Sequence, residues 1–202
     1  RHLSGNLDFV RQLPALTSLT LSNCVNLDCR DALSQLSSWE PTSSTLEEVN
    51  LSGTNVQGEL TVQIMAWLTS LQFKNFRACG RLTVPEMFSS HLKGYNIEHI
   101  DLYSLSTVEG KLKSFATLRS LTHLNLSGCQ KVSGWLHPLV HLTNLRELNL
   151  RCCSNVSGMC EALSSVTSLT SLGLCECKAL TSFEGLEYLT NLQSLDLRST
   201  SI

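Results

Sequence analysis

The sequence has no excess of charge of one sign, because 15 lysine and arginine residues are balanced by 17 aspartate and glutamate residues in a chain of 202. Proteins that bind nucleic acid or membrane surfaces usually carry basic clusters, so this balance favours neither partner. The chain also lacks a run of about 18 apolar residues, the least that a membrane-spanning helix needs. No secretory signal peptide is recognisable at its start. We therefore expect no membrane span in this stretch.

Catalytic motifs are missing as well. The sequence contains no glycine-rich phosphate-binding loop, no G-x-S-x-G nucleophile turn and no H-E-x-x-H zinc motif. We expect no enzymatic activity, no catalytic residues and no cofactor.

What the chain does have is an internal repeat. The segment LTHLNLSGCQKVSG, which begins at Leu121, recurs in altered form along most of the sequence. The copies begin at Leu16, Leu46, Phe73, Ile97, Leu121, Leu145, Leu169 and Leu192. From Phe73 onward these starts are 24, 24, 24, 24 and 23 residues apart. A fixed period of about 20 to 50 residues indicates a solenoid, in which similar coils stack side by side.

The shared pattern L-x-x-L-x-L-x-x-C-x-x-V-x-G-x-L resembles the leucine-rich repeat family. It is similar to the variant with 24 residues per repeat, which occurs in plant-type and some protist proteins. The copies from Ile97 onward match it well. The resemblance implies an α/β fold: a leucine-rich repeat solenoid, which is a curved, right-handed coil with a parallel sheet on its concave face.

Alternation of apolar and polar residues supports the same fold. In the copy at Leu121 it places Leu124 and Leu126 on one face of a strand and the residues between them on the other. We expect a strand to start at each of the copy starts, and the strands to form one continuous parallel sheet. Gly134 and Gly158 indicate unusual backbone conformations or close approaches. Helix-like leucine spacing from Leu136 to Leu145 predicts a turn of α- or 3-10 helix on the return side.

The early copies are less regular. The first two starts are 30 residues apart, and the cluster rich in serine, threonine and proline at 37–45 predicts a surface loop. The copy assigned to Phe73 departs most, because Phe76 and Ala78 replace leucines and neither Cys nor Asn stands at its ninth position.

Nine cysteines are present, and several recur at the repeat period. The ninth position of the copies holds Cys24, Thr54, Cys129, Cys153, Cys177 and Thr200. Because free cysteine is among the most buried residue types, we expect Cys129, Cys153 and Cys177 to be buried, stacked and reduced. No cysteine pair has the C-x-x-C spacing of zinc sites, so we expect no metal site. Reduced cysteines favour a cytoplasmic location.

Three N-x-S/T sequons, at Asn50, Asn125 and Asn155, point instead to a cell-surface or secreted protein. The repeat generates N-L-S by construction, however, so fortuitous matches are expected.

The candidate binding surface is the concave face, to which the third, fifth and seventh positions of each copy contribute. The outer copies have mostly small residues there, and the middle copies have charged and aromatic ones. The candidate partner-binding residues are Arg77, His99, Asp101, Tyr103, His123, Glu147 and Arg151. Arginine and tyrosine are typical of interaction hot spots, and the alternative is a solvated face without a partner. His99, His123 and Glu147 share one column, but strands about 4.8 Å apart favour a polar row over a metal site.

These observations predict a protein-protein interaction module that binds a macromolecular partner, a protein and not a nucleic acid, on its concave face. Two alternatives remain open. The chain could be the substrate-recognition arm of a larger enzyme such as a ubiquitin ligase or an effector, or part of a receptor ectodomain or surface antigen. We interpret residues 1–202 as one leucine-rich repeat domain, a fragment of a longer array, since neither end carries the polar cap that a solenoid needs.

Overall fold

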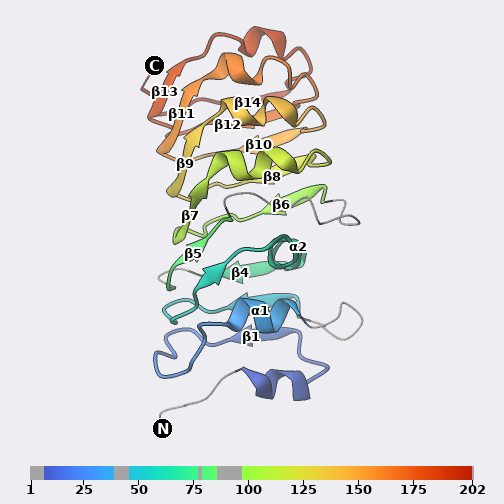
Figure 1. Cartoon of the computed structure of the whole chain (residues 1–202), viewed down its shortest axis with the longest axis vertical. Coiled ribbons are helices and arrows are strands. Elements are labelled where there is room, and N and C mark those ends of the chain that lie inside the picture. The colour runs from blue at the N-terminus through green and yellow to red at the C-terminus, as the bar shows by residue number, and fades with distance from the viewer. Residues whose placement is uncertain (1–6, 39–45, 77–78, 86–96, 202) are drawn as a thin grey trace.

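The computed structural model describes residues 7–38, 46–76, 79–85 and 97–201. They form a stack of coils running from the N-terminus to the C-terminus, with strands on two sides and short helices on a third (Figure 1). One cluster of buried apolar residues runs through the whole stack. No helix in these described ranges is long and apolar enough to cross a membrane.

One row of short parallel strands follows the leucines of the repeat. It comprises β1 (Ser18–Thr20), β2 (Glu48–Asn50), β4 (Phe73–Asn75), β6 (His99–Asp101), β8 (His123–Asn125), β10 (Glu147–Asn149), β12 (Ser171–Gly173) and β14 (Ser194–Asp196). Seven of these strands begin at the third position of their copy, two residues after the predicted start, and only β4 starts where predicted. We call the surface formed by their outward side chains the concave face.

The copy assigned to Phe73 begins two residues earlier than predicted. Phe73 pairs with Glu48, which holds the third position of its own copy, so this copy begins at Leu71. In the corrected register Lys74 occupies the fourth position, where other copies have an apolar residue, and Cys79 occupies the ninth. The prediction that this copy lacks a cysteine at its ninth position is therefore wrong.

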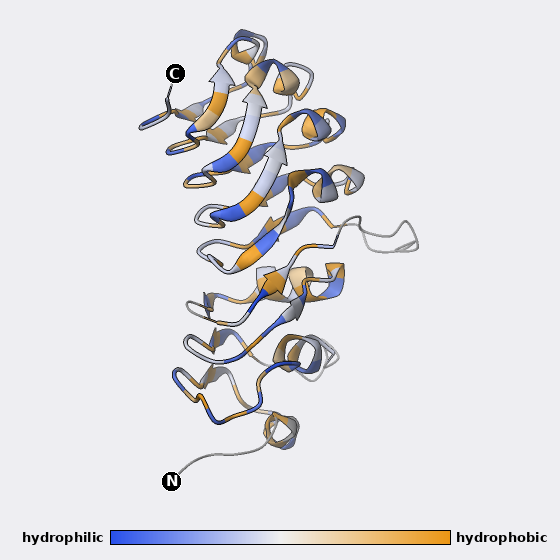
Figure 2. Ribbon diagram, turned by 60° about the vertical axis from the view of Figure 1, so that its left-hand side comes forward, coloured by the Kyte–Doolittle hydropathy of each residue, from blue (hydrophilic) through white to orange (hydrophobic). Residues whose placement is uncertain are grey.

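A second parallel sheet, which the sequence analysis did not predict, lies along another side of the stack. It consists of β3 (Gly58–Glu59), β5 (Leu82–Thr83), β7 (Val108–Lys111), β9 (Lys131–Trp135), β11 (Asn155–Met159) and β13 (Ala179–Ser182). In β9, Val132 is buried and Trp135 points outward; Figure 2 shows this alternation of hydropathy along the strands. Gly134 and Gly158 have positive φ angles of 118° and 108°, which explains the repeated glycine.

The return side carries the predicted helical turns. Two α-helices, α1 (Ala32–Ser37) and α2 (Val62–Ser70), lie in the longer N-terminal copies. The other return segments are 3-10 helices: η1 (Asp8–Gln12), η2 (Leu112–Thr117), η3 (His137–His141), η4 (Cys160–Leu163) and η5 (Leu186–Tyr188). The turn predicted between Leu136 and Leu145 is thus confirmed as η3. The loop predicted at 37–45 lies outside the described residues except for the end of α1.

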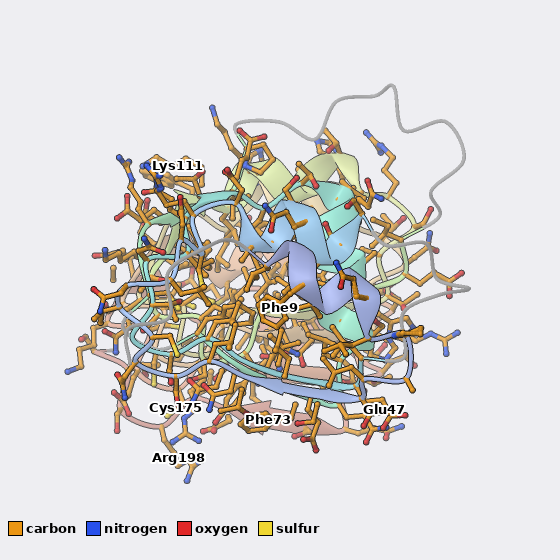
Figure 3. All side chains as sticks on the ribbon, turned by 90° about the horizontal axis from the view of Figure 1, so that it is seen from below. Phe9, Glu47, Phe73, Lys111, Cys175 and Arg198 are labelled. Atoms are coloured by element: carbon orange, nitrogen blue, oxygen red, sulfur yellow. The ribbon has the colours of Figure 1, made fainter. Side chains whose placement is uncertain are left out.

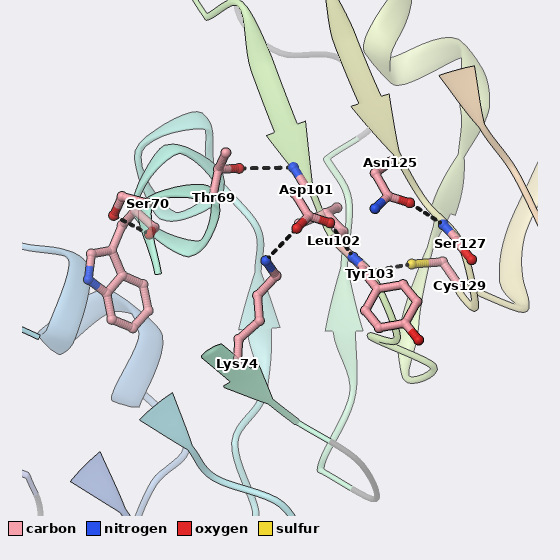
Figure 4. A network of polar contacts seen from close by, with 10 residues as sticks. Thr69, Ser70, Lys74, Asp101, Leu102, Tyr103, Asn125, Ser127 and Cys129 are labelled. Atoms are coloured by element: carbon pink, nitrogen blue, oxygen red, sulfur yellow. Dashed lines mark hydrogen bonds and ion pairs between the residues drawn. The ribbon is translucent and has the colours of Figure 1, made fainter. Parts of the chain in front are cut away.

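The strand row is divided, so the prediction of one continuous sheet is wrong. Strands β1, β2 and β4 form one sheet and β6 to β14 another, whereas the second sheet pairs β5 with β7 across the same point. The end of α2 lies against β6, where Thr69 Oγ1 accepts a hydrogen bond of 2.9 Å from the Asp101 N–H (Figure 4). Lys74, whose side chain is 8% exposed, forms an ion pair of 2.8 Å with the Asp101 carboxylate. A helix end and one ion pair therefore join the two parts where a backbone ladder joins other coils.

A left-handed residue at the eighth position turns the chain out of each strand. Positive φ angles occur there at Asn23, Gly53, Ser104, Gly128, Cys152, Glu176 and Ser199. Only two of these are glycines, so no single residue type in the sequence marks this turn.

The ninth-position cysteines form a ladder through the core. The thiols of Cys129, Cys153 and Cys177 each donate to the carbonyl oxygen at the sixth position of the preceding coil, at 3.0 to 3.1 Å. Cys79 makes the same contact with Leu51 at 3.0 Å. The three predicted cysteines are fully buried, and all nine cysteines are unpaired. The prediction of buried, stacked, reduced cysteines is confirmed.

We expect these three thiols to resist labelling in the native protein. Burial raises the pKa of Cys129 and of Cys177 to about 12, and it raises the pKa of Cys153 as well. At pH 8 a disulfide reagent should react readily with the half-buried Cys152 and leave the three ladder thiols unmodified. Denaturation should release all nine cysteines, which provides the control. Rapid native labelling of the ladder cysteines, detected by mass spectrometry, would contradict this.

The same shift has a consequence for alkaline stability. An unfolded thiol has a pKa near 9.0, so above that pH the unfolded chain gains thiolates that the folded chain does not. The free energy of unfolding should therefore fall as the pH rises from about 9 towards 12.

Candidate binding surface

The third-position column brings three predicted residues together. His99, His123 and Glu147 lie opposite one another on β6, β8 and β10. The two histidine rings stack with centroids 4.2 Å apart, and His123 Nε2 lies 3.5 Å from Glu147 Oε1. No group of three or more histidine, cysteine, aspartate or glutamate side chains within the described ranges could hold a metal ion. The column is a polar row that presents Glu147 to solvent.

The fifth-position column is structural. In this column Asp101 Oδ1 accepts a hydrogen bond of 2.9 Å from the N–H of Tyr103, two residues later. Equivalent bonds form at Asn50, Asn125, Asn149 and Asp196. Together with the Lys74 ion pair they engage both oxygens of Asp101. Asp101 therefore stabilises the turn after its strand and is less free to bind a partner than the sequence analysis expected; the recurrence of Asn or Asp at this position was the available signal.

The seventh-position column contains the most exposed candidates. Tyr103 is 57% exposed, and Arg151 is also exposed and forms no ion pair within the described residues. Arg198, two strands further on, forms two hydrogen bonds of 2.8 Å with Asp196, which lower the pKa of that carboxyl to about 2. Because that pair is neutralised internally, Arg151 is the free cation of this part of the face.

Arg77 is a predicted site residue that falls outside the described residues. The corrected register of its copy moves it from the fifth to the seventh position, the column of Tyr103 and Arg151.

A hollow of about 280 Å³ lies on the concave face between β8 and β14. Its floor includes Ser171, Gly173 and Ser194, and Glu147 and Arg151 stand at its edge. A Cβ atom at Gly173 would lie 2.9 Å from Asn149 Oδ1, so the missing side chain leaves this floor open. The sequence analysis treated these small residues as bland, and it therefore missed Gly173, Asn149 and Asp196 as lining residues.

The structure thus separates the seven candidates. Glu147, Arg151 and His123 line the hollow, and His99 and Tyr103 lie one or two strands away. Figure 3, a view along the stack, shows Arg198 and Cys175 on this side of the molecule and Lys111 on a different side.

No family model matches the chain, and no curated protein matches it. Solved structures do. The complex of TLR13 with a single-stranded RNA is 21% identical, matches 96% of this chain and 27% of that one, and has a TM-score of 0.53. A TDR receptor is 19% identical over 98% of this chain and 37% of that one, with a TM-score of 0.50. An LRR protein of Leptospira interrogans is 19% identical over 98% and 53%, with a TM-score of 0.48. The chain spans about half or less of the length of these structures, and at such identities the likeness shows the fold.

Proposed function

We propose that this chain, which has the leucine-rich repeat fold, is a protein-interaction module that binds an extended segment of a partner protein in the hollow of its concave face. The observation that carries the proposal is the hollow itself, floored by small residues and edged by Glu147 and Arg151. These two residues are four positions apart along the chain, which corresponds to about 13 Å in an extended strand. A segment crossing the hollow could therefore place a basic group at Glu147 and a carboxylate at Arg151.

The mixed charge of the hollow favours a protein over a nucleic acid. Glu147 and Asp196 line it together with Arg151, so a polyanion would meet carboxylates as well as a guanidinium. The structurally similar TLR13 was solved with RNA, which makes RNA the natural competitor to test. A non-enzymatic role and a cytoplasmic location remain parts of this proposal, and the nine unpaired cysteines support the latter.

The test is a comparison of bait variants. A partner captured from the native source by the chain should bind Glu147→Ala and Arg151→Ala about 30-fold more weakly, which corresponds to the roughly 2 kcal/mol typical of a hot-spot residue. Ser18→Ala and Ser22→Ala, at equivalent positions of the first copy, should bind like the parent. Equal losses in both sets, or preferential binding of a single-stranded RNA, would contradict the proposal.

A further inference from the structure

The outward side of the second sheet carries an apolar patch that the proposed function does not use. We call the surface over β7 to β13 the lateral face. Trp135 at the end of β9 is 67% exposed, and Met159 at the end of β11 is 48% exposed. The Trp135 ring lies over Gly158, where a Cβ would be 3.5 Å from the indole. Both residues line a hollow of about 430 Å³ with Val140 and Ala162. Large exposed tryptophan and methionine side chains in one hollow are typical of an interaction site.

Charges of opposite sign flank this patch along the stack. On its N-terminal side Lys111 and Lys113 are exposed, and Lys111 Nζ donates to the uncharged Ser133 hydroxyl at 3.0 Å. Glu109, the carboxylate on that side, is already paired with Arg81 at 2.8 Å and with Lys131 at 2.9 Å. The C-terminal side of the patch carries the exposed Glu161 and Glu184. The lateral face thus runs from basic through apolar to acidic.

Such an order is complementary to itself under two-fold rotation. An axis parallel to the strands and lying between β9 and β11 reverses the order of the coils and keeps the strand direction. It would place Trp135 against the Met159 of a second copy and Lys111 and Lys113 against its Glu184. The same operation applies to both copies, so each charge contact forms twice and the contact closes as a dimer.

We infer that the lateral face binds a second copy of this chain. Four coils spaced about 4.8 Å apart, with strands of up to five residues, give a flat area on the order of 300 Å² per copy. Stable dimers usually bury about 800 Å² per partner, so this dimer forms weakly and reversibly. The lateral face and the concave face lie on different sides of the stack (Figure 3), and a dimer would leave both concave faces open.

Sedimentation velocity of the chain over a concentration series tests this inference. The parent chain should shift from the monomer mass to twice that mass as the concentration rises, and Trp135→Ala should weaken the association at least about tenfold, as expected for a central tryptophan anchor. Phe9→Ala, an exposed aromatic far from this face, is the matched control and should associate like the parent. A chain that stays monomeric into the millimolar range would overturn the inference.

Charge reversal separates the two-fold contact from other modes of association. Lys111→Glu/Lys113→Glu and Glu184→Lys should each stay monomeric, because like charges then face one another twice. An equimolar mixture of the two variants should dimerise again, since both contacts become attractive. Failure of the mixture to recover, or growth beyond a dimer, would overturn the proposed geometry. Circular dichroism of each variant excludes unfolding as the cause, and none of these residues lines the concave hollow.

Discussion

Replacement of Asp101 by alanine should lower the free energy of unfolding by about 3 kcal/mol, the low end of the cost of removing one partner of a buried ion pair. The cost arises at Lys74, which is only 8% exposed and has Asp101 as its ion-pair partner. Lys74 occupies an inward position where the other coils have an apolar residue, so without the carboxylate its ammonium group would lie unpaired beside the core. Chemical denaturation of the purified variant measures the loss.

Two further variants identify the cause. Asp101→Asn keeps an oxygen that can accept from the Tyr103 N–H but removes the charge, so it should lose most of the same stability. The double variant Asp101→Ala/Lys74→Leu removes the stranded charge and supplies the apolar residue that the repeat favours, and it should regain most of the loss. If the double variant is as unstable as Asp101→Ala, the turn contact of Asp101 and not the ion pair carries the effect.

Replacement of Gly185 by alanine should cost about 3 kcal/mol as well, for a different reason. Gly185 has a φ of +95°, where an L-residue is strained by about 1 to 2 kcal/mol. An added Cβ would also overlap the Glu161 backbone at Cα and lie 2.9 Å from its nitrogen, so the coils would have to separate, which adds the usual cost of overpacking.

Gly58 is the matched control for this variant. Its φ is +130°, yet no atom lies within 4 Å of where its Cβ would be. Gly58→Ala should therefore show the backbone strain alone, about 1 kcal/mol. Equal losses at Gly58 and Gly185 would show that the close approach of η5 to the preceding coil contributes nothing.

The regular part of the fold could be predicted from the sequence because one period governs it. The positions of Leu124 and Leu148, the buried thiols of Cys129 and Cys153 and the turn at η3 all follow from coils that repeat with the same length. The prediction failed at Phe73, since Phe73 and Phe76 imitate the first and fourth leucines while Lys74 conceals the true fourth position. The second sheet was missed because glycine replaces an inward apolar residue at its centre and so interrupts the alternation.

The candidate site was predicted in part for the same reason. The row of His99, His123 and Glu147 follows directly from the period and is present. The hollow was not predictable in this way, because it depends on the missing side chain of Gly173 and on the ion pair that removes Arg198 from the free charges. An absence of atoms and a pairing between side chains are properties of packing, which a column of residue types does not contain.

The division between β4 and β6 bears on the cooperativity of the whole chain. In a solenoid the coils are coupled mainly to their nearest neighbours, and most junctions here share backbone ladders in both sheets. At this junction the ladder between β5 and β7 remains, and on the other side side-chain contacts of Thr69 and Lys74 replace it. The coils before and after it therefore form two cooperative units that share one edge. The stability of this chain is then described by two unfolding free energies and a coupling term, and a two-state fit would average quantities that belong to different parts of the molecule.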